Sequence, residues 1–354
     1  MQKNILVIGN GYDIAHGLET RYDDFINFIQ RAEDDDSFIE DEADREFIHR
    51  CVKENGFLQF FLAYTNEVPG WVDLERLLAT VVEYFRLFIS NYQHFIDQHC
   101  NISWNSMDFD MGSNTKMMTI HCLYMFDALY DRAGSRGDRY MKHLNPKYYI
   151  HEFGLNKREV LNMLKQQLDE IIALLRMYLE AHLNERRDCL KKIRQIEEID
   201  PSYVISFNYT DTYKIYGIDP ENVFHVHGSL AKDNMVLGFN DDNSENLDYI
   251  YFKKYFQRIQ KLTGYIDPDK IRERNSLGTY NYPVIHFYGH SMDKTDEDVI
   301  QKLRTMASGF VIYTYDQNDY EQKVINLIDV FGKNEAMEMI ETKFIRFLQC
   351  ESGT

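Results

Sequence analysis

Residues 1–20 read MQKNILVIGNGYDIAHGLET, and this stretch decides the fold class. The apolar run 5–8 is short and rich in β-branched residues, and Gly9-Asn10-Gly11 closes it, which predicts a buried strand that leads into a glycine turn. We expect a helix just beyond, whose free N–H groups suit a phosphate. The third glycine of a dinucleotide fingerprint is missing, since Ile14 stands there and the next glycine is Gly17. A tight turn without a ligand is therefore an equal interpretation.

The composition is acidic and limits the kinds of partner. The 354 residues include 57 acidic and 39 basic residues, which gives a formal net charge of −18. This charge repels nucleic-acid backbones and anionic membranes. Five scattered cysteines form no C-x-x-C pair, so they predict neither a zinc module nor a disulfide framework. We found no signal peptide and no apolar run of membrane-spanning length, which favours a cytoplasmic protein with no membrane partner and no direct nucleic-acid partner.

The part of the chain from 21 to 200 has mostly helical spacing. Apolar residues recur with helical periodicity in 22–31, 71–92 and 155–199, and Asp73 suits the N-cap of the second helix. Two acidic runs, 33–36 and 41–46, are expected to face solvent. The helical pattern fails in 100–116 and in the basic stretch 131–147, both of which we interpret as loops.

Beyond residue 203 the pattern changes to short apolar runs that are typical of buried strands. With the first run they make about five strands, the usual size of a parallel α/β sheet, and helical stretches separate several of them. We expect a parallel doubly wound sheet built from 1–20 and 201–354, with 21–200 as a large helical insertion after the first strand. The four later runs are 203–207, 223–226, 284–288 and 310–315.

A corner rich in glycine or polar residues follows each of four expected strands. Because parallel strands end at one edge of the sheet, where ligands bind in such folds, the corners should lie together. Each corner alone also fits ordinary turn chemistry, so the prediction depends on their joint occurrence. The corners are Gly9-Asn10-Gly11, Asn208-Tyr209-Thr210-Asp211, His227-Gly228-Ser229 and Gly289-His290-Ser291-Met292-Asp293.

These corners resemble those of sirtuins. The opening with Gly17 is similar to G-A-G-I-S-x-x-x-G, the corner at Asn208 to Q-N-I-D, the corner at His227 to H-G-S, and the corner at Gly289 to G-T-S-L. Over nearly the whole chain, the strings IGNGYDIAHGL, WVDLE, SFNYT, HVHGS and YGHSMDKTD resemble the AbiH abortive-infection family of phage-defence proteins.

The resemblance implies a Rossmann-like, sirtuin-like NAD-binding fold and an effector that hydrolyses NAD to nicotinamide and ADP-ribose. The zinc cysteines of sirtuin deacylases are absent from the sequence, which argues against deacylation. The matching positions imply Asn208 and His227 as catalytic residues. They imply contacts to NAD from Gly9, Asn10, Gly11, Tyr12, Asp13, Gly17, Asp211, Gly228, Ser229, Gly289, His290, Ser291 and Asp293.

The chemistry of NAD hydrolysis suits the same residues. Nicotinamide leaves as a neutral molecule from a cationic ring, so the enzyme needs chiefly to hold the ribose and a water and to stabilise developing charge. Asn208 offers donors and acceptors without charge, and His227 suits proton removal near neutral pH. Asp13 suits a ribose hydroxyl, although its charge is unfavourable beside a pyrophosphate.

Several roles have structural alternatives. Asp211 is expected either to orient Asn208 or the ribose, or to cap the following helix. Asp293 and Asp296 are candidates for ribose contacts or for helix capping, and capping is the favoured role of Asp296. Glu75 is expected to reach the site from the insertion.

Two other classes of function stay open. His225 and His227 form an H-x-H pair, but we expect no metal because the sequence offers no third ligand nearby. The rival functions are a non-catalytic sensor of NAD or ADP-ribose that signals through the insertion, and a metal-dependent nuclease, against which the charge argues. Because a toxic hydrolase must be inactive at rest, a homo-oligomer or a phage-derived activator is an expected partner.

Overall fold

The computed structural model describes residues 3–65, 73–96, 113–133, 140–150, 154–240, 247–263, 266–274 and 279–351. The chain divides into two compact units, each described here by itself. The first unit comprises Met1–Arg21, Leu179–Asp242 and Lys253–Thr354, and the second comprises Tyr22–Tyr178 and Asn243–Phe252. The second unit thus ends before residue 200, where we expected the insertion to end, and it takes in a short later segment.

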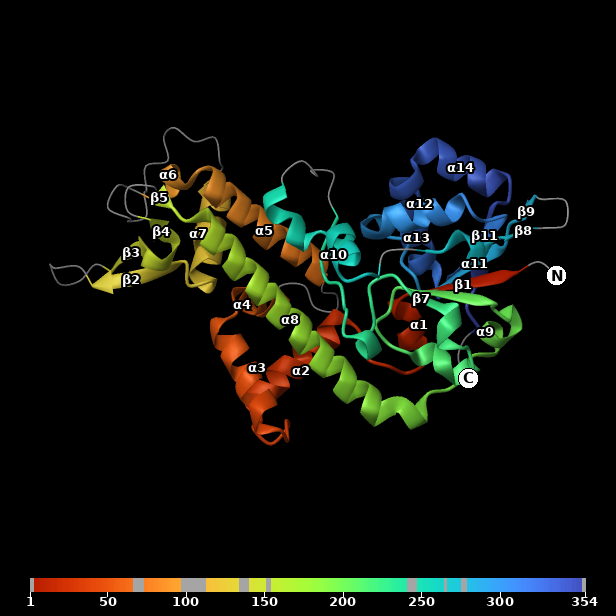
Figure 1. The fold of residues 1–354 in the computed structure, drawn as a ribbon, viewed down its shortest axis with the longest axis horizontal. Helices are drawn as coiled ribbons and strands as arrows, with labels where there is room; N and C mark the ends of the chain where they lie inside the picture. Colours follow the sequence, from red (N-terminus) through yellow and green to blue (C-terminus); the bar gives the residue numbers. More distant parts are fainter. Residues whose placement is uncertain are drawn as a thin grey trace. The chain divides into compact units, whose positions relative to one another are not determined.

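The first unit contains a six-stranded, all-parallel sheet, which confirms the expected α/β class. Strands from the red, green and blue parts of the chain lie side by side in it (Figure 1). Its order is β12-β11-β10-β1-β6-β7, so the direction of winding reverses between β1 and β10. The strands are β1 (Asn4–Ile8), β6 (Tyr203–Ser206), β7 (Val223–His225), β10 (Val284–Tyr288), β11 (Gly309–Thr314) and β12 (Ile345–Gln349). All five expected strands are present, and β12 is an additional edge strand.

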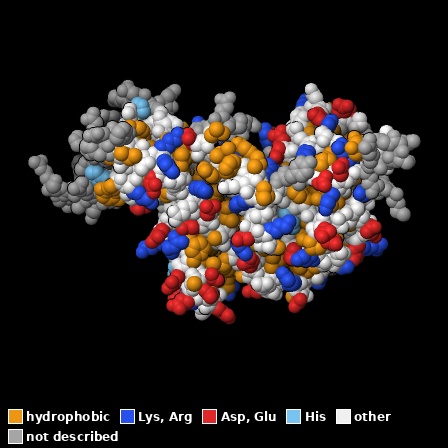
Figure 2. Space-filling view, in the orientation of Figure 1, with side chains coloured by type: hydrophobic (Ala, Val, Ile, Leu, Met, Phe, Trp, Pro, Cys, Tyr) orange, Lys and Arg blue, Asp and Glu red, His pale blue; other side chains and the backbone are white. Residues whose placement is uncertain are grey.

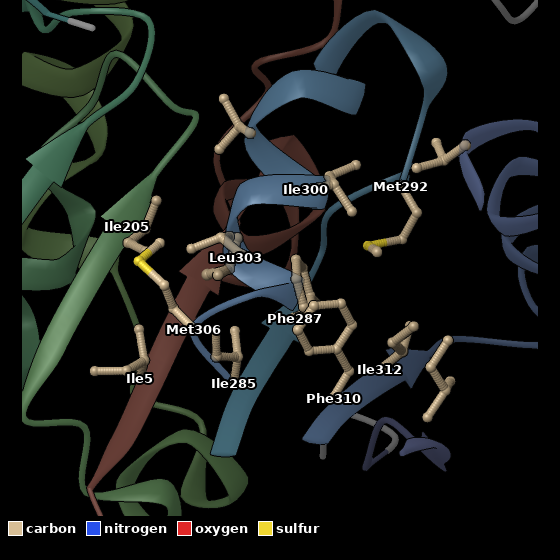
Figure 3. Close-up of a cluster of buried hydrophobic side chains, with 14 of the residues drawn as sticks. Ile5, Ile205, Ile285, Phe287, Met292, Ile300, Leu303, Met306, Phe310 and Ile312 are labelled. Atoms are coloured by element: carbon tan, nitrogen blue, oxygen red, sulfur yellow. The ribbon is translucent and has the colours of Figure 1, made fainter. Parts of the chain in front are cut away.

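Both faces of the sheet are buried, which explains why its central strands are continuously apolar. Ile5 and Val7 of β1 enter one hydrophobic cluster, whereas Leu6 and Ile8 enter another on the opposite face. Figure 3 shows the first cluster, in which side chains of β1, β6, β10 and β11 pack against Ile300 and neighbouring residues. Each fully buried aliphatic side chain of this kind contributes about 1.5–3 kcal/mol to folding.

Short helices cover the two faces of the sheet. Residues of α11, α12, α13 and α14 contribute to the first cluster, and residues of α1 and α9 to the second. The helices of this unit are α1 (Asn10–Ala15), α9 (Arg194–Ile199), α10 (Lys254–Gln260), α11 (Pro268–Ile271), α12 (Glu297–Arg304), α13 (Gln317–Phe331) and α14 (Lys333–Glu341). A two-stranded ribbon, β8 (Glu273–Arg274) with β9 (Tyr280–Asn281), completes the unit.

The second unit is mostly helical, as the sequence predicts. Asp73 caps α5 by accepting a hydrogen bond from the Arg76 N–H, and the side chains of both acidic runs are largely exposed, which confirms these expectations. Acidic side chains gather over the α2–α3 corner in the lower part of Figure 2. The helices are α2 (Tyr22–Asp34), α3 (Glu42–Glu54), α4 (Gly56–Thr65), α5 (Leu74–Ser90), α6 (Tyr92–Phe95), α7 (Ser113–Met125) and α8 (Lys157–Arg186), of which α8 continues into the first unit.

Two segments that we interpreted as loops are partly regular. Residues 113–116 begin helix α7, although 100–112 lie outside the described residues. In 131–147, the strands β2 (Leu129–Ala133) and β3 (Tyr140–Leu144) pair as an antiparallel hairpin. Pairing between strands, which single-segment periodicity does not capture, stabilises this polar stretch. A smaller antiparallel ribbon joins β4 (Tyr149–Ile150) and β5 (Gly154–Leu155).

Candidate functional site at the carboxyl ends of the strands

The glycine turn after β1 packs tightly against the corner after β10, where the winding of the sheet reverses. The Gly11 N–H donates a hydrogen bond of 2.9 Å to the Gly289 carbonyl. A Cβ at Gly9 or Gly11 would lie 2.8 or 3.0 Å from that carbonyl oxygen. The Tyr315 hydroxyl donates to the Gly11 carbonyl at 2.5 Å. These glycines therefore allow two backbones to approach, and the Gly11 N–H is paired within the protein.

Other expected contact residues near this turn differ in their exposure. Asn10 and Ser291 have exposed side chains, and Asn10 Oδ1 accepts a hydrogen bond of 2.5 Å from the Thr20 hydroxyl. Tyr12 is fully buried, and its hydroxyl has no hydrogen-bond partner among the described residues. Gly17 is exposed with φ +90°, and a Cβ there would meet nothing within 4 Å. Asn10 and Ser291 are thus the accessible polar side chains of this group.

The corner after β7 is tied to Asn234. Gly228 has φ +77°, and a Cβ there would lie 2.1 Å from the Asn234 carbonyl oxygen. The Ser229 N–H donates to Asn234 Oδ1 at 2.9 Å. Both residues are buried, and this contact accounts for the glycine.

The aspartates near the corners have distinct partners. Asp293 accepts a hydrogen bond from the Thr295 N–H and caps the short 3-10 helix η7 (Lys294–Asp296), which confirms the capping alternative. Asp211 Oδ2 lies 2.5 Å from Lys214 Nζ and makes no capping bond to the helix that follows it. The capping role that we favoured for Asp296 is wrong, because its side chain makes no cap bond to α12. It turns instead into a buried group of charged and basic side chains.

Asn208 lies beside the glycine turn in a buried polar network. Its amide Nδ2 donates to the Gly9 carbonyl at 3.0 Å. The Thr210 hydroxyl donates to Asp13 Oδ2 at 2.6 Å, and the Thr212 hydroxyl donates to the Thr210 hydroxyl oxygen at 3.2 Å. Asp13 Oδ1 is buried without a partner among the described residues. The carboxyl group of Asp13 is therefore held below the surface by neighbouring hydroxyls.

Burial makes the charged form of Asp13 unfavourable. Desolvation raises the pKa of this carboxyl to about 6 from 3.8, although the hydrogen bond from Thr210 and the nearby polar side chains of Thr212 and Asn208 act in the opposite direction. The folded protein therefore binds a proton here more tightly than the unfolded chain does. Its contribution to stability is complete below pH 3.8 and is lost as the pH rises through 6.

We expect Asp13→Asn to stabilise the protein at pH 8 and to have a much smaller effect at pH 4. The substitution removes a buried charge and keeps an oxygen that accepts from Thr210. A shift of roughly two pKa units corresponds to about 3 kcal/mol at most. Urea unfolding at pH 4, 6 and 8 measures the difference from the wild type, with Asp329→Asn, at an exposed aspartate of the same unit, as the control. If the difference in unfolding free energy between Asp13→Asn and the wild type is the same at all three pH values, burial does not raise the pKa of Asp13.

A second buried group centres on Asp296. His227 Nε2 lies 3.1 Å and Lys254 Nζ 3.3 Å from Asp296 Oδ1, and His290 Nε2 lies 3.7 Å from Oδ2. All four residues are at most 7% exposed. His227 Nε2 lies within ion-pair distance of Asp296 Oδ1, but the two groups are not aligned for a good hydrogen bond. We call these four residues the Asp296 cluster. His227 comes from the corner after β7, Lys254 from α10, and His290 and Asp296 from the stretch that joins the corner after β10 to η7, so three separate segments converge.

The cluster keeps its histidines neutral. Burial lowers the pKa of His227, and the nearby Lys254 ammonium lowers it further, against the attraction of the Asp296 carboxylate. Burial lowers the pKa of His290 to about 4. Despite the cost of desolvation, Lys254 and the two histidines hold the pKa of Asp296 far below its usual range. The carboxylate is thus ionised and the imidazoles are uncharged at neutral pH.

Phe207 lies between the two polar groups. Its ring packs edge-on against His227, with centroids 5.3 Å apart, and against His290, with centroids 4.2 Å apart. The next residue in the chain is Asn208, which faces the glycine turn. The structure thus brings Asn208, His227 and His290 to the same edge of the sheet.

The rival metal pair is separated into two environments. His225 Nδ1 donates to the Asn208 carbonyl at 3.0 Å, and its ring packs near Tyr213, whereas His227 faces Asp296. Within the described ranges, no group of three or more His, Cys, Asp or Glu side chains is placed to hold a metal ion. Glu75 lies on α5 of the second unit.

Sequence reasoning missed Lys254 and gave Asp296 the wrong role. A lysine at the start of an amphipathic helix normally points its charge to solvent, so Lys254 carried no signal of burial. The string YGHSMDKTD does contain Asp296, six residues after His290, which was the available clue.

Three comparisons with known proteins complete the description of the site. A family model described as "Bacteriophage abortive infection AbiH" matches residues 5–315, which include every segment of the Asp296 cluster. Searches of curated proteins and of solved structures gave no match. In the part of the chain that the structure describes, every helix is too short or too polar to cross a membrane.

Proposed function

Because the chain belongs to the AbiH family of bacteriophage abortive-infection proteins, we propose that it is a defence effector that hydrolyses NAD to nicotinamide and ADP-ribose. Its sheet would be a Rossmann-like, sirtuin-like platform that binds NAD at the carboxyl ends of the strands. One observation carries the proposal: a neutral histidine, His227, is buried against an ionised carboxylate at that edge. Such a pair is suited to accept a proton near neutral pH.

The residues at the edge divide the work of the reaction. The bond between the nicotinamide nitrogen and ribose C1′ breaks with its electron pair going to nicotinamide, and a bond from water oxygen to C1′ forms. His227 takes the proton that the water loses and later releases it to solvent, while Asp296 stabilises the imidazolium. Asn208, an uncharged amide, orients the ribose or the water.

The substrate contacts are distributed over the exposed and buried parts of the edge. The exposed side chains of Asn10 and Ser291 suit phosphate or ribose oxygens. The Gly11 N–H is already bonded to the Gly289 carbonyl, so side chains rather than this N–H would hold the pyrophosphate. The buried Asp13 would act through Thr210 and Asn208 rather than by direct contact.

We expect purified protein to release nicotinamide from NAD, and we expect His227→Gln and Asn208→Ala to lower the rate by about a hundredfold or more. Glutamine keeps a donor toward Asp296 but has no basic nitrogen, so the fold is preserved and the base is lost. Nicotinamide is measured by chromatography. The control is His286→Gln, because His286 lies within β10 and faces the Tyr313 hydroxyl at 3.1 Å.

The same assay separates the rival functions. The protein is tested alone, with phage-infected cell extract, and at concentrations that favour self-assembly, because a phage component or a second copy is the proposed activator. Binding of NAD without nicotinamide release in every condition would favour a sensor of NAD or ADP-ribose. Cleavage of nucleic acid that is lost when a chelator removes metal ions would favour a metal-dependent nuclease. The first result overturns NAD hydrolysis, and the second does so where no nicotinamide is released in any condition.

A further inference from the structure

The hydrogen bonding of His290 determines which of its nitrogens carries a proton. The Met292 N–H donates to His290 Nδ1 at 2.9 Å, so Nδ1 is an acceptor and is unprotonated. In the neutral ring the proton is therefore on Nε2, which faces Asp296 Oδ2 at 3.7 Å. A second proton would have to displace the Met292 bond. His290 is thus held in one neutral tautomer beside the carboxylate and is unsuited to exchange protons with a substrate.

The position of Asp296 also distinguishes the two nitrogens of His227. His227 Nε2 lies 3.1 Å from Asp296 Oδ1, and although its alignment is too poor for a good hydrogen bond, the negative charge of the carboxylate favours the tautomer that carries the proton on Nε2. The basic nitrogen is then Nδ1, on the other side of the imidazole. This is the atom that is left to accept a proton from a substrate or a water.

Two opposite charges lie next to His227. Asp296 contributes one negative charge, and Lys254, which is 1% exposed, places one positive charge 3.3 Å from the same carboxylate oxygen. Protonation of His227 would therefore place a second positive charge beside the Lys254 ammonium in a buried site. Lys254 thus opposes protonation of His227, and Asp296 favours it.

We propose that Asp296 and Lys254 are positioning residues that set His227 as a base acting through Nδ1, Asp296 by fixing its tautomer and Lys254 by keeping it unprotonated. The catalytic part of this inference rests on the proposed NAD hydrolysis. The tautomer and the effects of the two charges on His227 are properties of the resting protein and can be tested without any substrate.

Two further cations act on the two histidines, and each has an acidic partner of its own. On α10, Arg258 pairs with Asp298 and further lowers the pKa of His227. On α13, Lys323 lowers the pKa of His290, and its ammonium lies 2.7 Å from Asp319 Oδ2. Phe207 supplies an apolar wall against both rings. Asp296 attracts a proton to His227 and Lys254 repels it, so neutralising each of these two residues should have opposite effects on His227.

We would titrate His227 by NMR in protein labelled with ¹⁵N-histidine, assigning its signals by their loss in His227→Gln. Lys254→Gln should raise the pKa of His227, because it removes a cation and keeps a hydrogen-bond donor. Asp296→Asn should lower it and abolish the preference for the proton on Nε2, which the ¹⁵N shifts report directly. Lys214→Gln, which removes an exposed lysine paired with Asp211, is the control and should change neither.

The direction of the two shifts decides the inference. A general loosening of the fold would expose His227 in both variants and move its pKa the same way. Shifts in the same direction, or a wild-type ring with its proton on Nδ1, overturn the assignment. If Asp296→Asn does not fold, the upward shift in Lys254→Gln and the wild-type tautomer still decide.

Turnover gives a second measurement. Lys254→Gln should move the acidic limb of the kcat/KM profile for nicotinamide release to higher pH, and Asp296→Asn should lower kcat about a hundredfold with KM little changed. Normal pH dependence in both variants would contradict the catalytic part. Absence of nicotinamide release from the wild type would overturn NAD hydrolysis alone, because the NMR result does not depend on it.

Discussion

Gly289→Ala is expected to destabilise the first unit by about 4–5 kcal/mol, which is close to the whole stability of a marginally stable domain. Gly289 has φ +67°, and a Cβ there would lie 2.0 Å from the Tyr12 nitrogen and 2.4 Å from the Gly11 carbonyl carbon. Both contacts are with backbone, so no side chain can rotate to relieve them. Urea unfolding followed by circular dichroism, or the yield of soluble protein if the variant does not fold, measures the effect.

Gly217→Ala is the matched control for this substitution. Gly217 has a similar φ of +72°, but a Cβ there would meet nothing within 4 Å. Gly217→Ala should lower the free energy of unfolding by only about 1–2 kcal/mol, which is the penalty for an alanine in the left-handed region. Equal effects at the two positions would mean that the turn after β1 and the corner after β10 are not in close contact, and the description of this edge would be wrong.

Asp296→Ala is expected to lower the free energy of unfolding by about 3–5 kcal/mol, because it removes the carboxylate that lies 3.3 Å from the buried Lys254 ammonium. The control is Asp329→Ala, which breaks the exposed pair with Lys294 and should cost about 0–1 kcal/mol. Urea unfolding at pH 7.5 gives both values.

A double substitution separates the cost of an unpaired charge from the worth of the pair. Lys254→Met with Asp296→Leu removes both charges and should recover most of the stability lost in Asp296→Ala, because apolar residues often replace a buried ion pair without loss. If the double variant is less stable than Lys254→Met alone and Asp296→Leu alone, the ion pair itself contributes net stability. Our expectation that apolar residues can replace the pair is then wrong.

The central strands were predictable because both of their faces are buried. The run 5–8 is apolar at every position, since alternate side chains enter the two hydrophobic clusters. β12 was missed for the opposite reason. It lies at an edge of the sheet, and Arg346, Leu348 and Gln349 are exposed, so it lacks the continuous apolar signal. The β2–β3 hairpin was missed because its pairing joins residues on either side of 134–139.

The sequence by itself determined the parallel sheet, its polar corners and the membership of the AbiH family. These properties depend on local pattern and short strings. Only the tertiary structure decided that the glycines serve contact between backbones and that Asp296 turns inward to meet Lys254 and the two histidines. In the sequence alone, a glycine suits a turn or a close contact between backbones equally well. An aspartate likewise suits a turn, a helix cap or a buried ion pair. What distinguishes these roles is which distant backbone or charge lies within a few ångströms, and folding alone sets that distance.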